Sequence, residues 1–307
     1  MTIPDFQSMM LPLLQLASDG EEHSIRGAVD ALAIHYSLTP EEKTQLLPSG
    51  QPVFYDRVTW TRTHLKKAGL LHDPKRGYFK ITDRGREVLQ RNPARIDMNY
   101  LGEFPEYNEF RTTRRGLAGT PSNGDGLDKL TPEEILEEAY QKIREGLSDE
   151  VLKAVINSSP GFFEKLVVEL LVKMGYGGSR REAARAVGGS GDQGIDGIID
   201  EDKLGLDTIY IQAKKWKKDS KVGRPEIHRF VGALQGQRAK KGIFITTTKF
   251  SDEAKRYADS IDTKVVLIDG ARLANLMIDH NVGVSAQSVY EIKRLDSDYF
   301  GEAPDQD

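Results

Sequence analysis

The sequence contains no cysteine among its 307 residues. This absence excludes disulfide frameworks, zinc sites with thiolate ligands and cysteine nucleophiles, and it is typical of the reducing cytoplasm. Long apolar runs are also missing, because stretches such as residues 265–268 are far shorter than the roughly 20 residues that cross a bilayer. The apolar segment 9–14 follows an acid, Asp5, instead of the basic residue of a secretory signal. We therefore expect a soluble cytoplasmic protein with no membrane partner.

A histidine metal site and a P-loop are also lacking, and one match to a dinucleotide motif lacks the context that the motif needs. The six histidines are scattered without the spacing of metal ligands. No Gly-Lys-Ser/Thr follows a glycine-rich loop, so there is no P-loop. Residues 189–194 match the dinucleotide pattern G-x-G-x-x-G, but an extended segment follows them. Because that motif binds a pyrophosphate at the start of a helix, the match does not favour a dinucleotide site.

The charge is distributed unevenly along the chain. Hydrophobic residues make up 38% and charged residues 29%, so a buried core is feasible, and the length suggests about two domains. The net charge of −4 combines an acidic segment, residues 1–52, with residues 53–95, which carry eleven basic and only four acidic side chains. A second basic cluster comprises Lys214, Lys215, Lys217, Lys218, Lys221 and Arg224. Such clusters are either solvated lysine surfaces or sites for a polyanion, and two of them in an acidic chain favour the polyanion.

Residues 1–95 predict short helices followed by a hairpin. The helix starts are expected at Ser24, Thr39-Pro40, Asp56 and Thr82. The extended segments 70–72 and 78–81 flank a tight loop. This order is typical of a winged helix-turn-helix domain, whose recognition helix enters the major groove of DNA while the hairpin lies over phosphates. Winged helices also act as protein-interaction modules, and the basic character of residues 53–95 favours DNA.

We expect double-stranded DNA to contact the recognition helix, the hairpin loop and the second basic cluster. The candidate contacts are Arg57, Trp60, Thr61, Arg62, Lys66, Lys67, Lys75, Arg76, Lys215, Lys217 and Lys218. A protein with such contacts would be associated with the nucleoid.

The rest of the chain predicts a linker and a second domain. Residues 96–130 include a small, polar, glycine-rich stretch that we interpret as a linker. Thr131-Pro132 begins a helix that ends near residue 156. Then follow a helix, two antiparallel strands and the order strand–helix–strand–helix, which predicts an α/β/α fold with a mixed sheet. The expected division is therefore a winged helix at 1–95, a linker at 96–130 and an α/β domain at 131–307.

The chemistry is expected on two neighbouring strands of the second domain. Residues alternate between the two faces of a strand, so Gln212 and Lys214 share one face, and Asp196 lies on a short strand between glycines. If these strands pair, a carboxylate, an amide and an ammonium converge. Oxygen ligands from Asp196, Gln212 and the backbone near Ala213 would suit a hard divalent cation such as Mg²⁺. Lys214 would orient or deprotonate a water and offset phosphate charge.

The spacing of Asp196 and Gln212-x-Lys214 resembles the PD-(D/E)xK nuclease superfamily, in its variant with glutamine as the second ligand. The surrounding motifs are Phe163-Glu164, Met174-Gly175-Tyr176, Gly191-Asp192-Gln193-Gly194-Ile195-Asp196-Gly197, Gln212-Ala213-Lys214 and Gly242-Ile243-Phe244-Ile245-Thr246-Thr247. With the N-terminal winged helix, they resemble the Mrr family of type IV restriction endonucleases over nearly the whole chain. The resemblance implies a restriction-endonuclease-like fold and a Mg²⁺-dependent endonuclease that cuts methylated DNA. Because cutting both strands needs two active sites, we expect a homo-oligomer, a dimer or higher.

The resemblance also implies roles that the residues alone leave open. It assigns the helix glutamate of the family to Glu164, as a metal ligand directly or through water, with Glu169 as the competitor and a solvated acid as the alternative. A methyl group could be read by an apolar contact in the major groove, for which Trp60 and Thr61 are candidates, or by a pocket for a flipped base. Two other functions stay open: a structure-specific repair or recombination nuclease, and a DNA-binding regulator that does not cleave.

Overall fold

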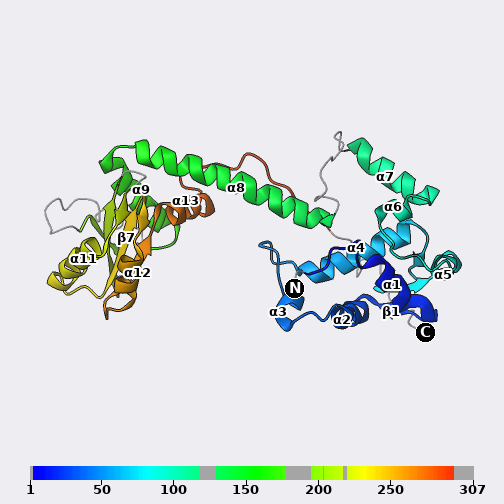
Figure 1. Cartoon of the computed structure of the whole chain (residues 1–307). Coiled ribbons are helices and arrows are strands. Elements are labelled where there is room, and N and C mark those ends of the chain that lie inside the picture. The colour runs from blue at the N-terminus through cyan, green and yellow to red at the C-terminus, as the bar shows by residue number, and fades with distance from the viewer. Residues whose placement is uncertain (1–2, 118–128, 178–194, 203, 217–219, 294–307) are drawn as a thin grey trace, which may run out of the picture. The chain divides into compact units, whose positions relative to one another are not determined.

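The computed structural model describes residues 3–117, 129–177, 195–202, 204–216 and 220–293, and the chain divides into two compact units, Met1–Ile143 and Arg144–Asp307 (Figure 1). One helix, α8 (Pro132–Asn157), begins in the first unit and ends in the second. The expected start of this helix is confirmed. Among the described helices, none combines the length and apolar character that a membrane span requires.

The first unit is a winged helix-turn-helix domain with additional helices. Its elements are α1 (Met10–Leu16), η1 (Ala17–Asp19), β1 (His23–Ser24), α2 (Ile25–His35), α3 (Pro40–Lys43), α4 (Val53–Lys67), β2 (Leu71–His72), β3 (Tyr78–Ile81), α5 (Asp83–Gln90), α6 (Met98–Leu101) and α7 (Pro105–Leu117). The three strands form an antiparallel sheet in the order β1-β3-β2, with Leu71 opposite Ile81. Helix α4 precedes the β2–β3 hairpin, as the recognition helix of this fold does. The expected fold of the first domain is confirmed.

Local capping explains most helix starts in this unit. The Ser24 hydroxyl accepts from the Gly27 N–H, and Thr39 forms a capping box with Glu42. The expected cap at Asp56 is wrong, because α4 begins at Val53. Val53 and its neighbour Phe54 are buried in this unit, so their packing extends the helix toward its N-terminus. Asp56 therefore lies inside the first turn of α4 instead of before it.

Residues 96–117 differ from the expected linker. They form α6 and α7, and the side chains of Ile96, Leu101 and Tyr107 are fully buried in the core of the first unit. The Tyr107 hydroxyl lies 2.7 Å from Nδ1 of His64, a buried residue of α4. This stretch therefore belongs to the first unit. Most of the glycine-rich stretch, residues 118–128, lies outside the described residues.

The second unit is built around a four-stranded mixed sheet. Its elements after α8 are α9 (Pro160–Lys173), β4 (Gly197–Asp200), β5 (Thr208–Lys214), β6 (Lys221–Val222), α11 (Arg224–Gly236), β7 (Lys241–Thr246), β8 (Lys249–Phe250), α12 (Asp252–Asp259), β9 (Lys264–Ile268) and α13 (Gly270–Asp279). The sheet order is β4-β5-β7-β9, in which β4 is antiparallel to β5 and the other pairs are parallel. Strands β6 and β8 form a separate parallel pair.

Helices cover both faces of this sheet, as the alternation of side chains along the strands requires. On one face, Ile209 and Ile211 of β5 pack with α9, α13 and the end of α8. On the other face, Phe244 of β7 packs against α11 and α12, where it contacts the ring of Phe230 edge to face. The α/β/α architecture expected from the sequence is thereby confirmed.

Candidate functional site

The expected catalytic strands pair with each other at one edge of the sheet. The register places Gly197, the first residue of β4, opposite Ile211, and Asp196 immediately precedes this strand. The Asp196 N–H donates to the Ile211 carbonyl at 2.8 Å, and the Asp196 side chain accepts from the Ala213 N–H. Asp196 is therefore bound by both neighbours of Gln212 in β5, which brings Asp196 and Gln212 close together.

A backbone hydrogen bond orients the Asp196 carboxylate. The Ala213 N–H donates to Oδ2 of Asp196 at 2.8 Å, and the Asp196 side chain is half-buried. In the part of the chain that the structure describes, Oδ1 has no hydrogen-bond partner. Such a carboxylate is fixed through one oxygen and can bind a cation or a water through the other.

The Gln212 amide is buried next to it. Gln212 is only 5% exposed, and none of the described residues makes a hydrogen bond to its side chain. A buried amide without a protein partner normally bonds an ordered water or an ion. A carboxylate oxygen and an amide oxygen form a donor set that fits Mg²⁺, which usually keeps several waters and takes only one or two protein carboxylates.

The expected metal site has few acidic ligands besides Asp196. Among the described residues, no group of three or more His, Cys, Asp and Glu side chains could hold a metal ion. Asp196 would thus be the acidic ligand, assisted by Gln212 and a backbone carbonyl. Glu164 lies on α9, which covers the opposite face of the sheet from Gln212, and its side chain is half-buried, whereas Glu169 is exposed.

Lys214 is the last residue of β5 and lies opposite Thr246 of β7. It is two residues after Gln212, so the two side chains leave the same face of the strand. Its side chain is half-buried and forms no ion pair with an acid of the described residues. An ammonium at this position can offset negative charge on a phosphate bound beside Asp196 and Gln212.

The second basic cluster is only partly described. The Lys215 ammonium donates to the Ser158 carbonyl, so the structure ties this expected DNA contact to the protein backbone. Trp216 packs against the cluster formed by α11 and α12. Lys217 and Lys218 lie outside the described residues.

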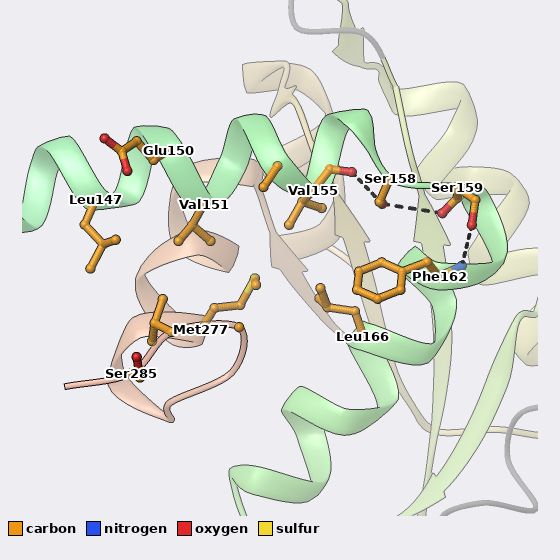
Figure 2. Close-up of a pocket in the computed structure, with 13 residues that line it drawn as sticks. Leu147, Glu150, Val151, Val155, Ser158, Ser159, Phe162, Leu166, Met277 and Ser285 are labelled. Carbon is orange, nitrogen blue, oxygen red and sulfur yellow. Dashed lines mark hydrogen bonds between the residues drawn. The ribbon is translucent and has the colours of Figure 1, made fainter. Parts of the chain in front are cut away.

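An apolar cavity of about 890 Å³ lies near the start of α9 (Figure 2). It is lined by Leu147, Glu150, Val151, Ala154, Val155, Ser158, Ser159, Phe162, Leu166, Met277, Gly283, Val284 and Ser285. None of Asp196, Gln212 and Lys214 lines it, and its one ionisable side chain is Glu150. The cavity therefore offers neither a metal site nor a cation for a phosphate, and the candidate chemistry belongs to the strand edge.

In the first unit, three expected DNA contacts face the interior. Thr61 is 0% exposed, and its hydroxyl donates to the Phe6 carbonyl at 2.7 Å. Arg57 forms an ion pair of 2.6 Å with Glu134, a buried residue of α8. The Trp60 indole N–H donates to Oε2 of Glu133 at 2.5 Å. The structure therefore corrects the expectation that Arg57, Trp60 and Thr61 read DNA, because the first turn of α8 and the N-terminal segment cover that side of α4.

The outward face of α4 carries a different set of side chains. Tyr55, Arg62 and Lys66 are separated by seven and four residues, which places them on one helical face. Tyr55 is 40% exposed. Thr59 has the same helical spacing, but its hydroxyl is buried. Sequence reasoning missed Tyr55, although it shares the helical period of the two basic residues. We identify Tyr55, Arg62 and Lys66 as the outward face of α4.

Ion pairs connect this outward face to the hairpin. Both Arg62 and Lys66 contact the carboxylate of Asp73, which begins the β2–β3 loop. Burial raises the pKa of Asp73, but hydrogen bonds from Lys66 and Arg62 outweigh it, so the pKa lies below its usual value. In the loop, Lys75 pairs with Glu22 at 2.7 Å, and Arg76 is exposed.

Asp56 is a half-buried carboxylate close to two acids at the start of α8. Burial, together with the charges of Glu133 and Glu134, raises its pKa to about 6, and its Oδ2 is buried without a hydrogen bond among the described residues. The folded chain therefore binds this proton more tightly than the unfolded chain. The contribution of Asp56 to stability is present below the ordinary pKa of 3.8 and is lost as the pH rises through about 6.

Asp56→Asn is accordingly expected to raise the free energy of unfolding near neutral pH by about 1 kcal/mol, a figure discounted for partial exposure. Below about pH 4 the gain should vanish, because the carboxyl is then protonated in both states. Denaturant unfolding at the two pH values measures the difference. Asp30→Asn, at an exposed acid of α2, is the control. A gain of equal size at both pH values would contradict the assigned cause.

The similarity to known proteins agrees with these two units. The model of the Mrr N-terminal domain matches residues 6–91, and the Mrr_cat model, described as restriction endonuclease, matches residues 156–277. A protein of Escherichia coli (strain K12), the type IV methyl-directed restriction enzyme EcoKMrr, is 38% identical over 309 residues. That match covers 98% of this chain and 100% of the relative.

Solved structures of other restriction enzymes show weaker likeness. MspJI restriction endonuclease in complex with a 27-mer oligonucleotide is 20% identical, with a TM-score of 0.31, over 67% of this chain and 49% of that one. The DNA modification-dependent restriction endonuclease AspBHI is 16% identical, with a TM-score of 0.34, over 70% and 56%. This chain thus spans about half the length of each, and only the full-length relative decides the family. The resemblance noted in the sequence is confirmed, and the chain belongs to the Mrr family of type IV methyl-directed restriction endonucleases.

Proposed function

We propose that this protein uses Mg²⁺ to hydrolyse phosphodiester bonds of methylated double-stranded DNA. The observation that carries the proposal is the hydrogen bonding of Asp196 to Ile211 and Ala213, which flank Gln212 in β5, with Lys214 on the same face of that strand as Gln212. Membership of the family adds support, since the relative from Escherichia coli is by name methyl-directed. Methylated DNA is therefore the substrate to test first.

The proposed mechanism assigns one role to each of the three side chains. Asp196 would hold the metal through the oxygen that Ala213 leaves free, and Gln212 would add its amide oxygen. The chemistry that Mg²⁺ would supply there is a lower pKa for a bound water and a positive charge opposite the phosphate. Lys214 would orient or deprotonate the attacking water and stabilise the charge that develops on the phosphoryl oxygens. Glu164 remains a proposed ligand through water.

A homo-oligomer follows from the proposed reaction. The described residues of one chain contain one such set of side chains, and cutting both strands of a duplex requires two. We propose a dimer or a higher oligomer as the active form, so that each strand meets its own Asp196 and Lys214.

We propose that DNA is bound by the outward face of α4 and by the β2–β3 loop. Lys66 and Lys67 are exposed, and Arg62 and Lys66 are oriented by Asp73 from the loop. Ammonium and guanidinium groups on one surface attract the phosphate backbone, and the exposed Tyr55 could contact a base edge beside them. This set replaces the inward-facing Arg57, Trp60 and Thr61.

Lys66→Ala combined with Lys67→Ala is expected to weaken binding to a duplex about tenfold and to reduce the slope of log affinity against log salt by about two. The physical reason is the loss of two phosphate contacts. Fluorescence anisotropy between about 50 mM and 200 mM salt, without metal, measures both quantities. Lys43→Ala, at a lysine of the acidic segment, is the matched control. An unchanged salt slope would remove this surface from the proposal.

The proposed function is tested by cleavage of two plasmids that differ only in methylation. We expect Mg²⁺-dependent cutting of the methylated plasmid, no cutting of the unmethylated one, and loss of all cutting with EDTA. Preferred cutting of branched, unmethylated DNA would instead indicate a structure-specific repair or recombination nuclease. Salt-sensitive binding without cleavage of any substrate would indicate a DNA-binding regulator.

A further inference from the structure

Three successive threonines lie beside the proposed catalytic strand. Thr246, Thr247 and Thr248 follow one another at the carboxyl end of β7, and all three are buried, Thr247 with 2% of its surface exposed. Strands β7 and β5 are parallel, and Thr246 is opposite Lys214, so both strands end at the same edge of the sheet. A buried hydroxyl is costly unless it is hydrogen-bonded, so the partners of these side chains are informative.

The Thr247 hydroxyl binds both backbone groups of one residue. It accepts a hydrogen bond from the Trp216 N–H at 2.9 Å and donates one to the Trp216 carbonyl at 2.7 Å. The ladder between β5 and β7 ends at Lys214 and Thr246, two residues before Trp216. One side chain thus satisfies the N–H and the carbonyl that the ladder no longer reaches.

The backbone of Thr247 packs against the start of another helix. Helix α13 begins at Gly270, where a Cβ atom would lie 2.4 Å from the Thr247 carbonyl oxygen. The Gly270 N–H also donates to the Thr248 carbonyl at 3.1 Å. The start of α13 therefore sits directly against the backbone of Thr247, and the clamped threonine has little room to shift.

A second contact holds the segment after β5. The Lys215 ammonium donates to the Ser158 carbonyl, at the junction between α8 and α9; Figure 2 shows Ser158 at this junction. The β5 ladder therefore ends at Lys214, and the two residues after it are bound by other parts of the unit, Lys215 by the Ser158 carbonyl and Trp216 by the Thr247 hydroxyl. The position of the Lys214 side chain depends on these two contacts.

We propose that Thr247 is a positioning residue for Lys214. Its hydroxyl fixes the backbone immediately after β5, which keeps the Lys214 ammonium on the face shared with Gln212. Thr247 does not contact the reacting atoms and acts through the main chain of Trp216. The inference rests on the proposed function, since it deepens the role given to Lys214 in that site.

The test compares Thr247→Val, which removes the hydroxyl at nearly constant volume, with Thr247→Ser, which keeps it. We expect Thr247→Val to lower kcat about tenfold to a hundredfold without changing DNA affinity, since a small misplacement of a catalytic group has effects of this size. Thr247→Ser should restore kcat to within about twofold. If Thr247→Val does not fold, Thr247→Ala replaces it in the same comparison.

Thr248→Val is the matched control, because it also removes a buried hydroxyl. That hydroxyl donates to the Ser220 carbonyl, which lies farther along the chain from Lys214 than Trp216 does. This variant should lower the melting temperature but leave kcat unchanged. Equal losses of kcat in Thr247→Val and Thr248→Val, or wild-type kcat in Thr247→Val, would overturn the inference.

A readout that is independent of cleavage separates this inference from the proposed function. Amide hydrogen exchange at Lys215 and Trp216 should be faster in Thr247→Val than in the wild type and in Thr247→Ser. If the wild type cuts no DNA, the proposed function fails, and exchange still decides whether Thr247 holds this segment. Unchanged exchange would overturn the positioning role.

Discussion

Lys214→Ala is expected to lower the cleavage rate about a thousandfold while leaving the affinity for DNA within about twofold. The ammonium lies at the end of β5 on the face of Gln212, where we propose that it acts on the phosphate and the attacking water. Since several other cations are proposed to bind DNA, its removal should affect the transition state far more than the ground state. Single-turnover cleavage and anisotropy measure the two quantities.

The neighbouring lysine provides the matched control for this variant. The Lys215 ammonium is bonded to the Ser158 carbonyl, so Lys215→Ala should lower stability while cleavage stays within about tenfold of the wild type. If Lys214→Ala cuts at the wild-type rate, or if Lys215→Ala loses as much activity, Lys214 does not have the role that we assign to it.

Asp196→Asn is expected to reduce cleavage about a thousandfold at low millimolar Mg²⁺ and to weaken metal binding. The substitution keeps an oxygen for the Ala213 N–H but removes the one negative charge of the proposed donor set. Because Gln212 contributes no charge, the metal affinity should depend on Asp196 more steeply than in a site with two acids. Calorimetric titration with Mg²⁺ and cleavage at rising Mg²⁺ measure the effect.

Asp200→Asn is the matched control, since Asp200 lies at the other end of β4, opposite Thr208. We expect wild-type metal binding and cleavage from it. Equal metal affinity in the wild type and in Asp196→Asn would show that the cation is bound elsewhere and would exclude the proposed donor set.

Local sequence patterns predicted most elements of both units, but not α6, α7 or the start of α4. The helix starts at Ser24, Thr39 and Ser159 have capping residues, and a cap acts within one turn of the chain, so the sequence shows it directly. Strand β5 also follows its sequence pattern, since alternate residues Ile209, Ile211 and Ala213 share the more deeply buried face. The mixed sheet followed from the order of these elements.

The candidate catalytic set was also predictable, since Gln212 and Lys214 are two residues apart on one strand. That spacing places their side chains on the same face whatever the rest of the chain does. To place Asp196 beside them, the sequence had only to show that the next extended segment pairs with this strand. The structure has that pairing, and the Ala213 N–H donates to the Asp196 carboxylate.

Contacts between distant segments were decided by the tertiary structure. Arg57 and Thr61 resemble DNA contacts in the sequence, yet Glu134 and the Phe6 carbonyl bind them, because α8 and the N-terminal segment dock on α4. Thr247 carries no local signal, since its partner Trp216 lies in the segment after β5, far from it in the sequence. The sequence alone therefore determined most helices and strands and the face of β5 that Gln212 and Lys214 share. Packing between distant segments decided which side chains of α4 are accessible to DNA and which residue binds the backbone next to Lys214.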